Sequence, residues 1–261
     1  MQSDNLKTEY YVDSTWYKLV PSSNGFALIL PANNLIDKLL CASVIKPLYM
    51  WAASKLPPYL DKVTDWEKSA QSAVIKSSNQ ATSLVWDACG KREILQELTK
   101  LTNLPWLEQS SAASWGRVRI DAYMVAISYS EMFEQINDDL AAQKIYTWMQ
   151  GVVPNQTFGL KVVVGERFEL NPSKVAVKCG WFLDEDETRM RTHAVTATKL
   201  SSGEIVGTVV LTAFEADKQM RRTYKDIYSR GDTVIAMHEE LAGPTLRTET
   251  KRMLDLAIST A

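Results

Sequence analysis

The chain has 261 residues, enough for one large domain or two small ones with a sizeable buried core. Apolar residues make up 46% and charged residues 23%, which is typical of a folded globular protein and excludes a disordered chain. The formal net charge is −2, from 29 basic and 31 acidic residues, so we expect no nucleic-acid partner.

Most of the N-terminal part is predicted to be helical. The first thirteen residues are polar and lack the basic and apolar regions of a secretory signal. Three helices are expected, over residues 35–53 with a kink at Pro47, over residues 59–89 with Gly90 as the stop, and over residues 92–102. Residues 1–110 are therefore interpreted as a helical N-terminal extension.

The apolar stretch at residues 26–53 is interrupted by Asn, Asp, Lys and Pro, so no run reaches the ~20 residues that a spanning helix needs. Peripheral lipid contact through residues 26–89 stays open beside packing on the rest of the chain or on a partner. Interfacial helices usually carry a strongly charged face, which this segment lacks, so packing is favoured.

After Ser110 the pattern indicates strands. They are expected over residues 117–130, 158–168, 174–183, 189–200 and 204–216, with one amphipathic helix over residues 136–152. C-terminal helices are expected over residues 218–228 and 245–259. The resulting division is a sheet domain at residues 111–222 and a helical extension at residues 223–261.

This order of elements favours a small α+β architecture in which one helix covers a face of an antiparallel sheet. Two arrangements fit it. One is the hotdog, in which the sheet wraps around a central helix, and the other is the cystatin-like or NTF2-like cone.

Residues 168–222 resemble the strand-rich half of hotdog-fold acyl thioesterases. The turn at residues 171–175 (NPSKV) stands where that family has P-G-D-x-V, and residues 202–207 (SGEIVG) resemble its D-G-x-x-V-A turn. Residues 213–217 (AFEAD) resemble its F-x-A-x-D phrase. With the opening helix included, the resemblance covers about residues 117–222 and implies a hotdog-like antiparallel sheet around a central helix.

The resemblance also implies a site at the start of that helix. Gln135, Ile136, Asn137 and Asp138 resemble the H-V-N-N phrase of the family, and Glu131 stands where its acid lies. Glu131 and Asp138 are then the implied catalytic residues, with the other three contacting an acyl thioester. Free amides at the helix start would stabilise the oxyanion, without a metal or cofactor.

Helix capping explains the same residues without catalysis. Asn and Asp are preferred just before a helix, where the side chain accepts a hydrogen bond from a free backbone N–H. The His and the Gly of the family phrase are absent here. Both interpretations stay open.

Cysteines and histidines give no second site. Cys41, Cys89 and Cys179 are far apart and form no C-x-x-C, which indicates reduced thiols of an intracellular protein, in the cytoplasm or an organelle matrix. With only His193 and His238 present, a metal centre is not expected.

Two functional hypotheses follow. The first is a degenerate hotdog-like domain that acts as a structural subunit, in a homo-oligomer or a larger complex. The alternative is a hydrolase or binding protein for acyl-CoA or acyl-carrier-protein thioesters. The chain has no G-x-S-x-G elbow, Walker loop, Rossmann fingerprint or H-E-x-x-H motif.

Overall fold

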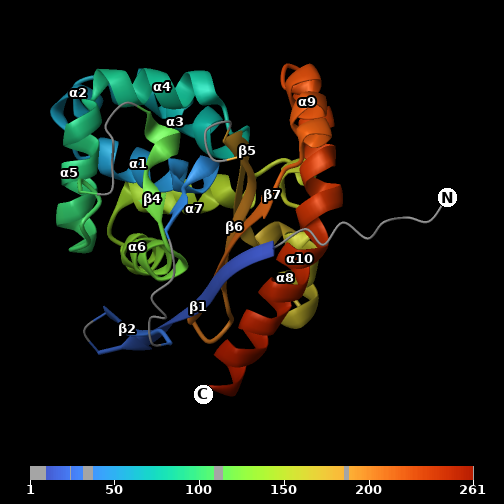
Figure 1. Ribbon diagram of the computed structural model, residues 1–261. Coiled ribbons are helices and arrows are strands. Elements are labelled where there is room, and N and C mark those ends of the chain that lie inside the picture. Colours follow the sequence, from blue (N-terminus) through green and yellow to red (C-terminus); the bar gives the residue numbers. More distant parts are fainter. Residues whose placement is uncertain (1–9, 24, 32–37, 109–113, 185–187, 261) are drawn as a thin grey trace.

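A five-stranded antiparallel sheet forms the middle of the molecule (Figure 1). This computed structural model describes residues 10–23, 25–31, 38–108, 114–184 and 188–260. In spatial order the strands are β2 (Gly25–Ile29), β1 (Tyr10–Ser22), β7 (Ile205–Glu215), β6 (Arg189–Lys199) and β5 (Ala176–Asp184). A two-stranded ribbon, β3 (Leu39–Leu40) with β4 (Arg119–Ile120), lies outside the sheet.

Most helices form a layer on one face of the sheet (Figure 1). They are η1 (Ala42–Ile45), α1 (Lys46–Ala53), α2 (Pro57–Leu60), α3 (Val63–Ile75), α4 (Asn79–Ala88), α5 (Lys91–Thr102), α6 (Ala122–Glu134) and α7 (Leu140–Gln150), with the short η2 (Trp115–Arg117) between α5 and α6.

A second layer covers the opposite face. It contains α8 (Leu160–Arg167), α9 (Lys218–Ile227) and the long α10 (Gly231–Ser259), with the short turns η3 (Pro154–Gln156) and η4 (Pro172–Lys174) nearby in the chain. Apolar side chains of α8 and α10 pack against Trp16, Val177 and Val210 of the sheet. The sheet is thus enclosed between two helical layers (Figure 1).

This three-layer arrangement shows that the predicted hotdog fold is wrong. No sheet wraps around a single central helix among the described residues. The N-terminal segment, predicted to be helical only, contributes β1 and β2, and β1 pairs with β7 from Tyr10↔Phe214 to Leu19↔Ile205.

Two segments predicted to be strands are helices. Residues 122–134 form α6, and Asp121 is its N-cap, since the Asp121 carboxylate accepts a hydrogen bond from Met124 N at 2.7 Å. Residues 160–167 form α8, which buries Leu160 and Val164 against α10. In both cases tertiary packing outweighs the intrinsic preference of Val, Ile and Tyr for strands.

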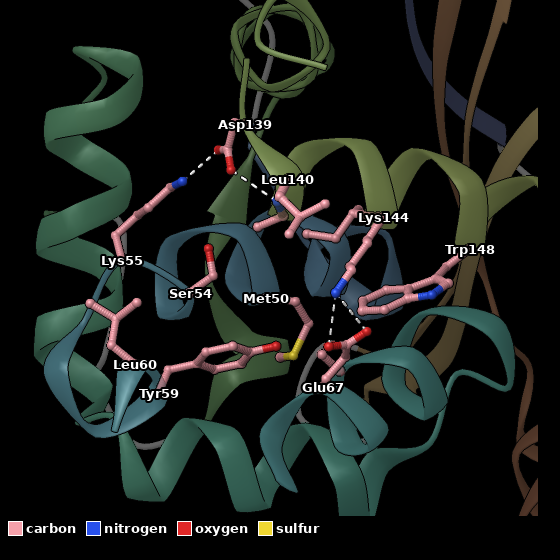
Figure 2. Close-up of a pocket in the computed structure, with 13 residues that line it drawn as sticks. Met50, Ser54, Lys55, Tyr59, Leu60, Glu67, Asp139, Leu140, Lys144 and Trp148 are labelled. Atoms are coloured by element: carbon pink, nitrogen blue, oxygen red, sulfur yellow. Dashed lines mark hydrogen bonds and ion pairs between the residues drawn. The ribbon is translucent and has the colours of Figure 1, made fainter. Parts of the chain in front are cut away.

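The helix expected over residues 136–152 exists but is shorter. It is α7, and Asp139 is its N-cap, accepting a hydrogen bond from Ala141 N at 3.0 Å. The second carboxylate oxygen of Asp139 accepts from Trp51 Nε1 at 2.8 Å and pairs with Lys55 (Figure 2). The capping interpretation is confirmed for this acid, one residue later than Asp138.

Two predicted helices are divided. Pro47 lies in the first turn of α1, where a missing N–H costs nothing, and does not kink a longer helix. The helix expected over residues 59–89 is interrupted between α3 and α4 at Lys76, Ser77 and Ser78. At the C-terminus, Gly243 and Pro244 lie inside α10 rather than in a loop.

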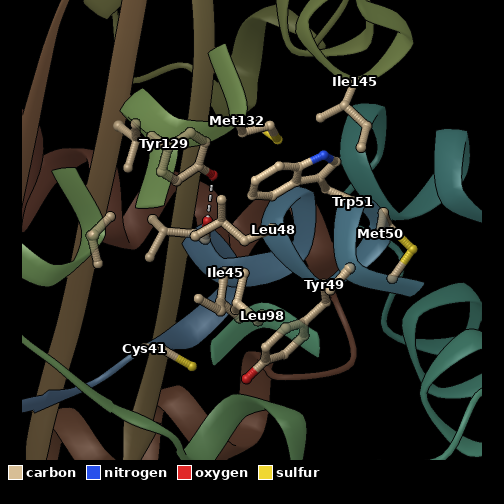
Figure 3. Packing of buried hydrophobic residues seen from close by; sticks show 14 of the residues in the cluster. Cys41, Ile45, Leu48, Tyr49, Met50, Trp51, Leu98, Tyr129, Met132 and Ile145 are labelled. Carbon is tan, nitrogen blue, oxygen red and sulfur yellow. Dashed lines mark hydrogen bonds between the residues drawn. The ribbon is translucent and has the colours of Figure 1, made fainter. Parts of the chain in front are cut away.

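The largest core lies between the sheet and the helical layer (Figure 3). Helix α1 is buried along its whole length, and Trp51 and Leu48 pack beside Met132 and Tyr129 of α6. The Tyr129 hydroxyl donates a hydrogen bond to Val44 O at 2.6 Å, which ties α6 to η1. The segment that leads into α1 is therefore held rigidly against the rest of the core.

Within the described ranges, no helix combines the length and apolar character needed to cross a bilayer. The expected homo-oligomer or complex and the intracellular location stay predictions.

Candidate active site

A cleft of about 580 Å³ opens where the helical layer meets the edge strand β5 and the N-terminal end of α10. Its lining comes from η1, the turn between α3 and α4, η2, η3, β5, α9 and the start of α10. Ser43, Ser77 and Asn79 are the polar side chains that line it beside η1.

Ser43 and Lys46 lie three residues apart at the junction of η1 and α1. In a 3₁₀ turn, side chains at positions i and i+3 eclipse one another, so both side chains project from the same face. Ala42, just before Ser43, has a φ of 48°, a backbone conformation that is costly for a residue with a Cβ. Such strain is often found at functional sites.

The turn between α3 and α4 meets the Lys46 side chain. Lys46 Nζ donates hydrogen bonds to Ser77 O at 2.6 Å and to Asn79 Oδ1 at 2.8 Å, and it lies 3.4 Å from Ser77 Oγ. Ser77 has a φ of 54°, which turns its backbone carbonyl toward the lysine. The neighbouring Ser78 has a structural role: its hydroxyl caps α4 by accepting a hydrogen bond from Ala81 N at 3.2 Å.

Strand β5 closes the other side of the cleft. A Cβ on Gly180 would lie 2.4 Å from Ser43 N and 2.7 Å from Val44 N, so only glycine allows the strand to approach this closely. Lys178, two residues earlier, is fully buried, and its Nζ has no hydrogen-bond partner among the described residues.

Burial changes the protonation of both lysines. Desolvation, together with the nearby charge of Lys178, holds the pKa of Lys46 well below its usual range. Desolvation also lowers the pKa of Lys178 to about 7. Burial thus favours the neutral form of Lys46, which can accept a proton from a neighbouring hydroxyl.

Trp115 of η2 covers Lys46. The Lys46 Nζ lies 4.6 Å from the centre of the indole ring. Trp115 is fixed in turn, because Tyr49 donates a hydrogen bond to its carbonyl at 3.0 Å and its Nε1 donates to Ser83 Oγ at 3.2 Å. The indole therefore limits the access of water to the lysine.

Comparison with known proteins identifies the fold. No protein-family model matches this chain, and no curated protein matches it. Solved structures do. A variant of the last common ancestor of Gram-negative class A β-lactamases, bound to 5(6)-nitrobenzotriazole, is 13% identical with a TM-score of 0.55, over 95% of this chain and 94% of that chain. This is the class A β-lactamase fold.

Two further class A-like structures agree. A mutant chromosome-encoded β-lactamase of Vibrio parahaemolyticus is 12% identical, with a TM-score of 0.52 over 90% of this chain and 94% of that chain. The TLA-3 extended-spectrum β-lactamase is 10% identical, with the same TM-score and coverage. These similarities replace the resemblance to hotdog thioesterases, which is wrong.

Class A β-lactamases and penicillin-binding proteins share three motifs, S-x-x-K, S-D-N and K-T-G. Three segments in and beside the cleft resemble these motifs. Here they read Ser43-Val-Ile-Lys46, Ser77-Ser-Asn79 and Lys178-Cys-Gly180. The middle residue differs in the second and third motifs. In the structure these middle residues serve the scaffold, since Ser78 caps α4 and Cys179 is buried among the residues that pack on α8 and α10.

Sequence reasoning missed this site although its signal was present. A Ser-x-x-Lys at the start of a helix, followed by Ser-x-Asn and later by Lys-x-Gly in a strand, could have been recognised. Each motif is short and common, and the middle residues of two differ from the usual pattern. Only the fold shows that the three segments meet.

The residues suggested by the hotdog resemblance lie elsewhere. Glu131 is on α6, Gln135 to Asp138 form the turn before α7, and none of them lines the cleft. Burial and the neighbouring Glu134 raise the pKa of Glu131. A catalytic role for Glu131 and Asp138, and substrate binding by Gln135, Ile136 and Asn137, stay predictions.

The two histidines are buried structural residues. His193 Nε2 donates to Leu40 O at 2.9 Å while its Nδ1 accepts from Thr212 N at 3.2 Å, so the ring anchors the segment that leads to Ser43. His238 Nδ1 lies 2.8 Å from Thr192 Oγ1. Within the described parts of the chain, no cluster of His, Cys, Asp or Glu is suited to a metal ion.

Proposed function

We propose that the protein is a serine acyl-transfer enzyme of the β-lactamase and penicillin-binding type, with Ser43 as the nucleophile. The observation that carries this proposal is the hydrogen bonding of Lys46 to Ser77 and Asn79, one turn from Ser43, beside a cleft that Ser43, Ser77 and Asn79 line. The fold alone does not imply an activity, so the proposal rests on these side chains.

The lysine activates the nucleophile. Neutral Lys46 accepts the proton of Ser43 Oγ as this oxygen attacks the carbonyl carbon of a substrate amide. The proton then passes by way of the Ser77 hydroxyl to the amide nitrogen, and the carbon–nitrogen bond breaks. The product is an ester on Ser43, and water later hydrolyses this ester to release the acid.

Backbone amides are available for the developing oxyanion. Ser43 lies in the first turn of η1, where N–H groups have no acceptor within the helix. Strand β5 is the edge of the sheet, and an edge strand presents unpaired N–H groups on its outer side. The close approach at Gly180 brings these two sources of donors together.

The lining indicates the charge and shape of the substrate. Lys76 and Arg117 line the cleft, and none of the described lining residues is an acid. We therefore expect an anionic substrate, such as a β-lactam or a peptide with a free carboxylate. Aromatic side chains line the outer part of the cleft: Trp115, Trp181, Phe182, Tyr224 and Tyr228. They favour a substrate with an apolar or aromatic acyl group.

The acyl ester should persist. Glu108 is the single acid in residues 103–118, the connection between α5 and β4, and its side chain is exposed. None of the described lining residues is a carboxylate that could activate water, so we expect release of the acyl group to depend on Lys46 beneath Trp115. Fast acylation followed by slow hydrolysis is the expected kinetic pattern.

Labelling with a fluorescent penicillin tests this function. The wild-type protein should form one covalent adduct, located on Ser43 by peptide mass spectrometry, with a rapid burst and turnover at least about tenfold slower. Ser43→Ala should abolish the adduct. Lys46→Met should slow acylation by about 10³-fold or more, because Ser43 and Lys46 act together in the acylation step.

Ser173→Ala is the matched control, because Ser173 is an exposed serine five positions before Lys178. It should label like the wild type. An adduct that survives in Ser43→Ala, or the absence of labelling by a panel of penicillins and D-alanyl-D-alanine thioesters, contradicts the proposal.

A further inference from the structure

A second pocket lies at the other end of α1. It has a volume of about 250 Å³ and is lined by α1, α2, α3 and α7 together with the connections between them (Figure 2). No lining residue is shared with the cleft that holds Ser43. The proposed acyl-transfer chemistry therefore leaves this pocket without a role.

The interior of the pocket is mostly apolar. Met50 of α1, Ala70 of α3 and Ile145 of α7 are buried residues of its lining. Trp148 lies at one side (Figure 2). Leu60 and Leu140 stand at the mouth with 56% and 63% of their surfaces exposed. Exposed leucines around an apolar depression are typical of a binding site rather than of ordinary surface.

One polar group points into this apolar space. Tyr59 of α2 is only 6% exposed, and its side chain lines the pocket. Figure 2 shows the hydroxyl directed toward the centre of the pocket, beside Met50 and Glu67. A hydroxyl that faces an open pocket can donate a hydrogen bond to an acceptor on a bound molecule.

The charged groups at the rim are already paired. Lys55 bonds to Asp139, whose carboxylate also accepts from Trp51 Nε1, and Lys144 lies 2.9 Å from Glu67 (Figure 2). A charged ligand would have to break one of these pairs within a mostly apolar site. A neutral ligand leaves both pairs intact.

We propose that this pocket binds a small neutral molecule with an apolar body and one hydrogen-bond acceptor, which the Tyr59 hydroxyl contacts. Sites for drug-sized ligands occupy roughly 300–1,000 Å³, so a single ring or a short branched chain suits this volume better. The acceptor lies against Tyr59, and the apolar body lies over Met50 and Ala70.

Three probes of similar size separate the parts of this proposal. Acetophenone has a ring and a carbonyl acceptor, ethylbenzene has the ring alone, and benzoate has the ring with a charge. Each is titrated into protein carrying ¹³C-methyl methionine, and the Met50 signal is assigned with Met50→Leu. Acetophenone should shift the Met50 methyl signal with the lowest Kd, ethylbenzene should bind more weakly, and benzoate should leave the signal unchanged.

Tyr59→Phe removes the hydroxyl and keeps the ring. It should weaken acetophenone about fivefold and leave ethylbenzene unchanged, as expected for the loss of one hydrogen bond. The matched control is Tyr228→Phe, which removes an exposed hydroxyl from the other cleft and should change neither affinity.

The proposal is overturned if acetophenone does not shift Met50, if benzoate binds as well as acetophenone, or if Tyr59→Phe leaves the acetophenone affinity unchanged. The titrations are repeated with Ser43→Ala, which lacks the proposed nucleophile. Because the two sites share no residue, binding at Met50 should persist in this variant, and failure of one proposal is distinguishable from failure of the other.

Discussion

Gly180 is the residue on which the geometry of the site depends most directly. It allows β5 to pass within contact distance of the backbone at Ser43 and Val44. The position of Val44 is fixed independently by the hydrogen bond from Tyr129. A side chain at position 180 therefore has to displace either the edge strand or the nucleophile segment.

Gly180→Ala should reduce acylation by roughly 100-fold, because a shift of about 1 Å at the reacting atoms has an effect of that size. We expect a loss of unfolding free energy of about 1–3 kcal/mol from overpacking. Stopped-flow labelling and urea unfolding measure the two effects. Gly116→Ala is the control, since Gly116 also lines the cleft but has open space around it, and it should resemble the wild type.

The two buried histidines make stability depend on pH. Desolvation lowers the pKa of His193 to about 4 and that of His238 to about 3, compared with about 6.5 in an unfolded chain. Below pH 6.5 the unfolded chain binds protons that the folded chain does not. The stability is therefore fully present above pH 6.5 and is lost as the pH falls toward 4.

Between pH 6 and pH 5 the free energy of unfolding should fall by about 1.4 kcal/mol per pH unit for each histidine. Urea unfolding at closely spaced pH values measures this slope. His193→Gln and His238→Phe lower the overall stability, but each should also remove about half of the slope. An unchanged slope in both variants would show that other groups cause the pH dependence.

Among the elements, α6 shows most clearly why sequence patterns misled. Its residues are buried on several sides, between the sheet and α1, so the segment has no polar face and no helical period. Val, Ile and Tyr then suggested a strand. Two carboxylates define the start of the helix instead, since Asp121 accepts from Met124 N and Asp13 of β1 accepts from Ala122 N, each at 2.7 Å.

Removing these caps should have unequal effects. Asp121→Ala should lower the unfolding free energy by about 1 kcal/mol, while Asp121→Asn, which keeps an acceptor, should be close to neutral. Asp13→Ala should cost more, about 2 kcal/mol, because Asp13 is only 7% exposed and its loss leaves a buried N–H unpaired. Thermal or urea unfolding distinguishes these three outcomes. Equal losses of unfolding free energy in the two alanine variants would contradict the larger contribution expected of Asp13.

The sequence pattern did not predict the break between α3 and α4. Alanines and valines continue on both sides of Ser77, so a single helix was predicted. The positive φ of Ser77 and the cap supplied by Ser78 cause the interruption. Hydrogen bonds to Lys46 compensate for this local strain, and they are long-range contacts that no local pattern reveals.

At the scale of the whole molecule, the sequence predicted three of the five strands in the sheet, together with α5, α7 and α9. Strands β5, β6 and β7 were found because β-branched residues and short turns mark them. Strand β1 was missed because it is buried on both faces around Trp16 and Tyr17, so it shows no alternation. The turn phrases that resembled thioesterases reflect the general chemistry of Asn-Pro and Ser-Gly turns, which unrelated folds share.

The pairing of β1 with β7 has a consequence for synthesis on the ribosome. The first strand of the sheet emerges early, but β7, with which it pairs from Tyr10 to Leu19, begins only at Ile205. This pairing cannot form until most of the chain has been translated. Pairings between such distant segments make folding slow and leave strand edges open to other chains in the meantime. The positions of Ser43 and Lys178 also depend on this late completion of the sheet. In a nascent chain of this protein the residues of the proposed catalytic centre therefore come together only when translation is nearly complete.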